Sequence, residues 1–181
     1  MKLINFLLIA LVVLFSSVGC LNNDKEKFSS SGIPLSDLQL KSFIAENNIN
    51  PLDIKTTDTA TIILYQKSEK NGFYVLTNVN SNMLTVANPE TTEGGIPSPI
   101  SVEYHNVSNG VRPFATIILN TDELQKRAYK VKITFKDNFM TEEMVNGKKG
   151  IIVFDKKNSS QTSGIQSVII YDKEKRVLLS E

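Results

Sequence analysis

Apolar and polar side chains alternate within residues 128–135. The two sets are Tyr129, Val131, Ile133 and Phe135 on one side and Lys130, Lys132 and Thr134 on the other. This period of two is typical of a β-strand, because successive side chains point to opposite faces of a sheet. The lysines indicate that one face remains in water, so the stretch predicts an antiparallel strand with a single buried face.

Other segments rich in β-branched and aromatic residues predict further strands. They are residues 59–66, 72–79, 82–89, 100–107, 112–120, 139–145, 149–155, 165–172 and 175–181. Three Asn-Gly pairs, at 71–72, 109–110 and 146–147, predict tight turns between strands, because this pair suits turns with positive φ. Residues 90–99 contain two glycines and two prolines and predict a long loop.

One helix is expected before the strands, over residues 36–46. Ser36 is a suitable N-cap, and Gln39 three residues later completes a capping-box pattern. Residues 47–51, which contain three asparagines and a proline, end the helix. Its apolar face, which we expect to pack on the strands, consists of Leu40, Phe43 and Ile44.

The predicted fold class is mainly β: antiparallel β-sandwich-like domains preceded by one short N-terminal helix. We expect residues 34–107 to form the helix plus a β-meander, and residues 108–181 to form an antiparallel β module, unless the two parts form one domain. The pentapeptide at 60–64, Ala-Thr-Ile-Ile-Leu, recurs at 115–119. We attribute this recurrence to shared strand composition rather than to a duplication.

The module at 108–181 resembles an immunoglobulin-like β-sandwich. The similarity lies in "AYKVKITFKDN", "GIIVFDKK" and "SVIIYDKEKRVLL", of which the last has the pattern of a final strand pair closing on a turn. The Cys, Trp and Cys that mark antibody domains are missing. The resemblance implies two facing antiparallel sheets.

Residues 1–19 have the three parts of a secretory signal peptide. Lys2 gives the positive start, residues 3–15 are mainly apolar, and residues 16–19 are small or slim. A membrane-spanning helix needs about 20 apolar residues, so this apolar segment is short for one. The alternatives are an uncleaved anchor helix and ordinary cleavage. All three interpretations place the remainder of the chain outside the cytoplasm.

The end of this segment, Ser17-Val18-Gly19-Cys20, resembles the lipobox of bacterial lipoproteins. Val18, Gly19 and Cys20 match the pattern, whereas Ser17 stands where leucine is usual. The resemblance implies cleavage between Gly19 and Cys20 and a thioether-linked diacylglycerol, with palmitate-type chains, on Cys20. Two acyl chains suffice for stable anchoring. We therefore expect a lipoprotein anchored in the cell membrane on its extracytoplasmic face.

Residues 20–33 would then comprise the lipidated Cys20 and a polar, flexible tether. Cys20 is the only cysteine, so no disulfide can form within the chain. Removal of residues 1–19 removes Lys2 and no acid, which leaves 19 basic and 19 acidic residues and a formal net charge of zero. This balance argues against nucleic acid as a partner. Besides the membrane, an envelope protein or polymer is the expected partner.

Catalytic chemistry has few candidate residues. His105 is the only histidine, and its place at the end of an expected strand predicts an exposed side chain with no catalytic role. The sequence contains no phosphate-binding loop, nucleophile elbow or spaced set of metal ligands. We therefore expect no catalytic residue, no cofactor and no metal. The resulting hypothesis is a non-catalytic binding or structural module tethered to the membrane.

Two alternatives remain: a small envelope hydrolase using His105 or a pair of distant acids, and a ligand-binding protein with a pocket under the loop at 89–99. Glu142 and Glu143 are strand neighbours, so they should point to opposite faces. Asp122 and Glu123 should open a short capped turn. Lysine-rich segments at turns, which either block edge pairing or contact anionic polymers, are residues 148–149, 156–157 and 173–176.

Overall fold

The computed structural model describes residues 32–67, 70–79, 82–91, 98–107, 111–156 and 164–181. The signal segment 1–19, Cys20 and most of the expected tether therefore lie outside the described residues. The Asn109-Gly110 pair and the greater part of the expected 89–99 pocket also lie outside them.

The described chain is mainly β, in antiparallel sheets with two short helices, as predicted. The helices are α2 (Asp37–Glu46) and α3 (Asp122–Arg127). The strands are β1 (Pro51–Thr56), β2 (Thr61–Lys67), β3 (Lys70–Val79), β4 (Asn82–Thr91), β5 (Ile100–His105), β6 (Phe114–Leu119), β7 (Lys130–Phe135), β8 (Met140–Met144), β9 (Gly150–Phe154), β10 (Ile165–Tyr171) and β11 (Val177–Ser180).

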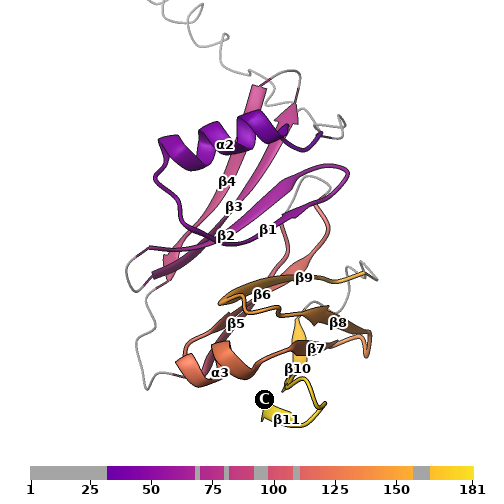
Figure 1. Ribbon diagram of the computed structural model, residues 1–181. Coiled ribbons are helices and arrows are strands. Elements are labelled where there is room, and N and C mark those ends of the chain that lie inside the picture. The colour runs from indigo at the N-terminus through magenta and orange to yellow at the C-terminus, as the bar shows by residue number, and fades with distance from the viewer. Residues whose placement is uncertain (1–31, 68–69, 80–81, 92–97, 108–110, 157–163) are drawn as a thin grey trace, which may run out of the picture.

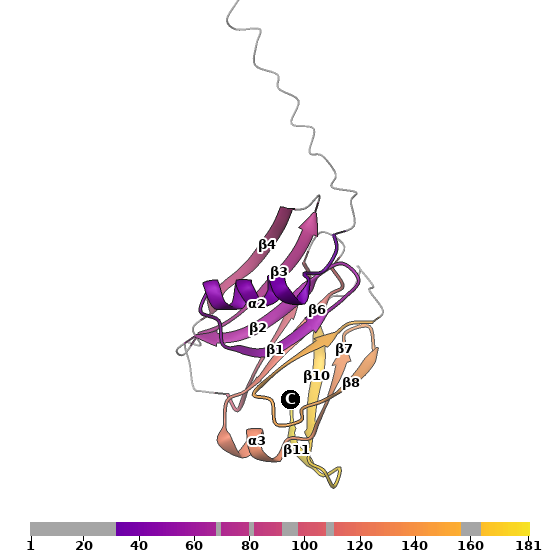
Figure 2. The same cartoon turned by 45° about the horizontal axis from the view of Figure 1, so that its top comes forward.

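The strands form three sheets, and α2 adds a fourth layer (Figure 1). The first sheet has the order β1-β2-β3-β4, the middle sheet β5-β6-β9, and the third sheet β11-β10-β7-β8. Figure 2 shows α2 lying across the first sheet, with the C-terminal strands at the other end of the stack. The middle sheet is thus covered on both faces.

The helix α2 forms as its sequence predicts. The Ser36 side chain accepts a hydrogen bond from the Gln39 N–H, and the Gln39 side chain accepts one from the Ser36 N–H, which completes the capping box. Phe43 is buried on the first sheet, where its ring meets Tyr74 edge-on at 5.2 Å between centroids. The aliphatic side chains packed around this contact include Leu35, Leu40, Ile44, Ile63 and Leu76.

The strand β6 connects the two large apolar interiors. Phe114 and Ile118 pack toward the first sheet, whereas the alternate residues Ala115, Ile117 and Leu119 pack toward the third sheet. Every residue of β6 is buried. A continuous apolar strand such as "FATIIL" is typical of a sheet that is covered on both faces.

The expected division after residue 107 falls between two paired strands. β5 pairs with β6 along its whole length, from Ile100 with Leu119 to His105 with Phe114. The two-sheet sandwich therefore begins at Ile100 and contains the middle and third sheets. A strand of the first expected part is therefore paired with a strand of the second.

Several local predictions need correction. The sequence does not predict the strand β1, because Asn50 and Pro51 indicate only the end of the preceding helix. Asn71 and Gly72 lie inside β3, paired with Gln66 and Tyr65, so the turn of that hairpin is not at this pair. The strand β4 continues through Pro89 to Thr91, which is possible because β4 is an edge strand of its sheet.

Other local predictions are confirmed. In β7, Val131, Ile133 and Phe135 are buried and alternate with partly exposed polar residues. Tyr129, expected on the buried side, lies outside the strand and is exposed. Asn146 and Gly147 have φ values of 51° and 75°, as a tight turn of this type requires. This turn leads from β8 in the third sheet to β9 in the middle sheet.

The fold begins earlier than expected. Ile33 exchanges two backbone hydrogen bonds with Asn78 at the end of β3, at 3.0 and 2.8 Å. Gly32 is buried, and a Cβ atom there would lie 1.9 Å from the Thr77 hydroxyl oxygen. The last two residues of the expected 20–33 tether are therefore part of the folded structure.

Candidate functional site

His105 is buried between the first and middle sheets, contrary to the prediction of an exposed side chain. Its ring packs against Phe73 at 4.3 Å and Phe114 at 5.0 Å between centroids. In β5, residues facing away from the third sheet would meet water in a simple sandwich, but here the first sheet covers His105. The sequence contains no local sign of this additional layer.

The polar contacts of His105 are few. Its Nε2 lies 2.9 Å from the Thr116 hydroxyl and 3.8 Å from a carboxylate oxygen of Glu103. Burial lowers the pKa of His105 from 6.5 to about 4, because desolvation disfavours the charged imidazolium. The imidazole is therefore neutral near pH 7.

Little space is available beside His105. The cavity lined by Phe73, Glu103 and Thr116 has a volume of ≈ 10 Å³, about the size needed for one water molecule. Among the described residues, the imidazole itself is 9% exposed. The hydrolase alternative therefore lacks an accessible histidine, and we assign His105 to the packing between sheets.

The acid pairs lie as their sequence positions predict. Glu142 points outward to Lys130, 2.8 Å away, whereas Glu143 pairs with Lys55 of β1. The Lys130 ammonium lowers the pKa of Glu142. Asp122 and Glu123 occupy the first turn of α3, which Thr121 caps by accepting a hydrogen bond from the Leu124 N–H. Neither pair forms two facing carboxylates across a cleft.

A buried carboxylate joins the first sheet to the middle sheet. The sequence did not identify this group. Asp53 of β1 accepts hydrogen bonds from the Lys148 ammonium at 2.5 Å and from the Ile152 N–H of β9 at 2.9 Å. Its side chain is 1% exposed. Apolar residues on both sides of Asp53 could have indicated this strand. The contacts indicate a structural role, because both oxygens are used by groups of the fold.

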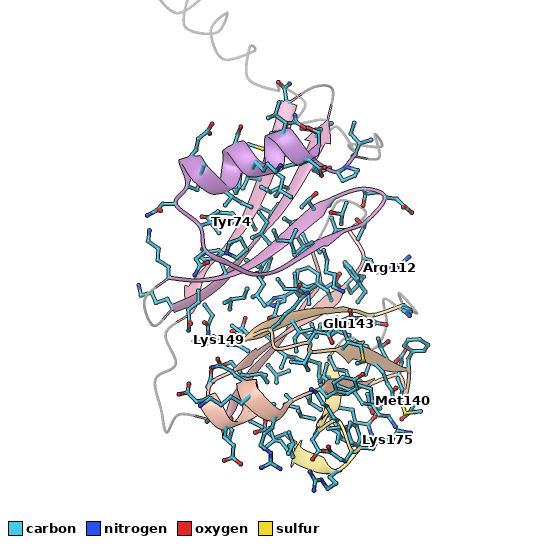
Figure 3. All side chains as sticks on the ribbon, viewed as in Figure 1. Tyr74, Arg112, Met140, Glu143, Lys149 and Lys175 are labelled. Carbon is cyan, nitrogen blue, oxygen red and sulfur yellow. The ribbon has the colours of Figure 1, made fainter. Side chains whose placement is uncertain are left out.

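The lysine-rich segments do not meet at one end of the molecule. Lys149 binds the side-chain oxygen of Gln66 and lies near the first sheet, whereas Lys175 lies in the β10–β11 turn at the far end (Figure 3). Asp172 is buried beside that turn, where the Arg176 guanidinium donates to it at 2.7 Å. Lys149 and Lys175, within the described residues, therefore do not share one basic surface for an anionic polymer.

The surface of the described residues includes two open hollows. One, of ≈ 290 Å³, lies between α3 and β11 and is lined mainly by Pro99, Leu124, Leu178 and Leu179. The other, of ≈ 310 Å³, lies at the β1–β2 turn, where it is lined by Thr56, Thr57, Asp58, Thr59, Arg112 and Phe154. Figure 3 shows Arg112 at the edge of the molecule. Both hollows are shallow and open to solvent, so they resemble contact surfaces more than enclosed ligand sites.

Comparison of the chain with known protein families, curated proteins and solved structures yields no match. Within the described residues, no three histidine, cysteine, aspartate or glutamate side chains gather around a possible metal position. No helix among the described residues is both long and apolar enough to cross a membrane. Cys20 and Gly19, the residues expected at the lipidation site, lie outside the described residues.

Proposed function

We propose that the chain is a small bacterial lipoprotein, anchored by a diacylglycerol on Cys20 at the extracytoplasmic face of the cell membrane. The observation that carries the proposal is the sequence Val18-Gly19-Cys20 directly after the apolar segment 3–15. The use of a solitary cysteine at this position also supports it. The thiol has no partner for a disulfide, whereas a thioether requires only one cysteine.

The folded part, by this proposal, is a non-catalytic binding or structural module. The burial of His105 and the use of Asp53 within the fold support this interpretation, because both groups are occupied by packing. The order of the last seven strands adds support for an immunoglobulin-like module. Strands one, two and five form one sheet and strands seven, six, three and four form the other, which differs from a constant-type domain in the place of the fourth strand.

Lipid labelling in a bacterial host tests the anchor directly. The full chain is expressed with a fatty-acid analogue that can be detected after extraction. We expect the wild-type protein to be labelled and to sediment with membranes, and Cys20→Ala to lose the label and leave the membrane fraction. Labelling of Cys20→Ala at the wild-type level would contradict the proposal.

Two matched variants make the labelling test specific. Ser17→Leu brings the segment to the usual lipobox pattern and should keep or increase the labelling. Leu21→Ala changes the residue after the modified cysteine and should keep the label, since the proposed attachment needs only the Cys20 thiol. Equal loss of label in Leu21→Ala would indicate a general defect in export instead of a lost attachment site.

A further inference from the structure

Exposed apolar side chains gather where the chain enters the fold. Among the described residues, five of the eight large apolar side chains that are exposed lie on α2, on β4 or at the entry point itself. We call these five the entry patch: Ile33, Leu38, Met83, Leu84 and Val86. Exposed apolar groups that cluster in this way mark contact surfaces more often than scattered ones do.

Backbone pairing holds the members of the entry patch together. Asn78 pairs with Ile33 on one side and with Met83 on the other. Leu84 pairs with Thr77, the next residue of β3. The Asn78 side chain also donates to Gln39, which follows Leu38 in the first turn of α2.

The first seven residues of strand β4 lack the charged side chains that commonly protect a sheet edge. Residues 82–88 contain no charged side chain, although edge strands are commonly shielded by lysines or other charges. Met83 and Leu84 point to opposite faces of the first sheet, yet 45% and 40% of their surfaces are exposed. The end of β4 therefore presents apolar surface on both faces.

The length of chain outside the fold limits the distance between this patch and the proposed anchor. Eleven residues separate Cys20 from Gly32, so the entry point lies within about 40 Å of the acylated residue even if the segment is fully extended. The opposite end, which carries the β10–β11 turn, lies three sheets away from α2 (Figure 1). Along the chain, the entry point at Ile33 lies nearer to the proposed anchor at Cys20 than the β10–β11 turn does.

The charged residues beside the patch include two acids and one base. Asp37 precedes Leu38, and Asp58 lines the adjoining hollow together with the exposed Arg112. Thr59, in the same hollow, accepts a hydrogen bond from the Thr77 hydroxyl at 2.6 Å. A surface of this kind is suited to shallow apolar insertion between lipid headgroups, with no requirement for anionic lipid.

We infer that the entry patch rests on the bilayer to which Cys20 is anchored, with Met83 and Leu84 inserted at the headgroup level. This inference depends on the proposed lipid anchor, because tethering holds the patch at a high effective concentration near the membrane. The β10–β11 turn and the hollow beside α3 then face away from the membrane, toward other components of the envelope.

Spin labels on single introduced cysteines test this orientation. Lipidation consumes the Cys20 thiol, so Leu84→Cys and Val177→Cys each give one reactive site in the full, lipidated chain. Both positions are exposed on edge strands, at 40% and 58%, and they lie at opposite ends of the stack. The labelled proteins are reconstituted in phosphatidylcholine vesicles, and collisions with oxygen and with an aqueous nickel complex are compared.

The orientation predicts a several-fold higher ratio of oxygen to nickel collisions at position 84 than at position 177. The same difference is expected in phosphatidylcholine–phosphatidylglycerol vesicles. The double variant Ile33→Ser with Met83→Ser should reduce the ratio at position 84.

Equal, water-like ratios at both positions on vesicle-bound protein would overturn the inference and leave the lipid anchor intact. Spin–spin broadening at position 84 would instead reveal a second copy on the patch and also overturn it, whereas loss of vesicle association in lipid-labelled protein would contradict both proposals.

Discussion

At the scale of single residues, the polar groups between the sheets are the least expected part of this protein. His105 sits against two phenylalanine rings and keeps one hydroxyl partner, and Asp53 keeps a lysine and a backbone N–H. Both satisfy the rule that buried polar groups need partners. The free-energy cost of burial differs between the two groups. Burial opposes the charged form of His105, whereas the carboxylate of Asp53 is paired with the Lys148 ammonium.

The low pKa of His105 predicts a pH-dependent stability. The folded protein binds the proton only near pH 4, whereas the unfolded chain binds it near pH 6.5. Stability should therefore be unaffected by this group above pH 6.5 and should fall as the pH decreases from 6.5 to 4. The full loss from this one group is about 3 kcal/mol. Urea unfolding between about pH 7 and about pH 4.5 measures it.

The matched variant for this measurement is His105→Gln, which cannot titrate in that range. Its stability should decline less steeply with acid than that of the wild type, because only the carboxylates, which both proteins share, still titrate. Glu103 is the charged group facing the imidazole, at 3.8 Å, and it is present in both proteins. Identical pH slopes for wild type and His105→Gln would show that burial does not shift this histidine.

At the scale of secondary-structure elements, the packing of adjacent sheets explains two sequence features. The repeated Ala-Thr-Ile-Ile-Leu segments lie in or directly before β2 and in β6, which are the strands buried on both faces in their sheets. Their similarity follows from this shared environment. The second feature is Gly150 at the start of β9, where the middle sheet approaches β1 and β2 closely.

Gly150→Ala should weaken the contact between the first and middle sheets. The added Cβ would lie 2.8 Å from Leu52 Cβ and 2.8 Å from Leu64 Cδ2, closer than carbon atoms can pack. Relief requires these strands to shift, at a cost of about 1–3 kcal/mol. Urea unfolding at neutral pH provides the measurement.

Gly147→Asn is the control for this substitution. No atom lies within 4 Å of the position of its Cβ, and asparagine tolerates the φ of 75° found at this turn. Its free energy of unfolding should change by less than that of Gly150→Ala. A larger effect at the turn than at Gly150 would show that the approach of the sheets does not limit side-chain size.

At the scale of the whole molecule, the middle sheet couples the two halves of the chain. The two largest apolar clusters both contain residues of β6 and β9, so the first and third sheets each pack on the same two strands. If either outer sheet lost its contact with β6, the buried β6 side chains that face it would be exposed to water. The described part of the chain should therefore unfold as one cooperative unit.

Phe114→Leu tests this coupling. Phe114 is fully buried and packs toward the first sheet, where its ring meets Phe73 at 5.3 Å. The smaller side chain should lower the free energy of unfolding by about 1–2 kcal/mol. Amide hydrogen exchange should then accelerate by a similar factor in β3 and in β10, on opposite sides of the middle sheet. Acceleration confined to β3 would show that the first sheet opens independently.

The sequence alone was sufficient for features that depend on neighbouring residues. The alternation in β7 and the turn at 146–147 predicted local structure correctly, as did the capping box of α2 and the capped turn of α3. These features depend on backbone geometry, side-chain period and hydrogen bonds within a few residues. The resemblance of residues 17–20 to a lipobox also depends on local residues alone, and the lipidation of Cys20 stays a prediction that lipid labelling can test.

Only the tertiary structure decided which faces of the strands are covered. The period of β5 shows two faces, but it contains no information on whether a second sheet covers His105. The same limit applies to Asp53, whose partners are about a hundred residues away in sequence, and to Met83 and Leu84, which would be core residues if β4 had another neighbour. Burial depends on what packs from elsewhere in the chain, so a local pattern can specify a strand without specifying its surroundings.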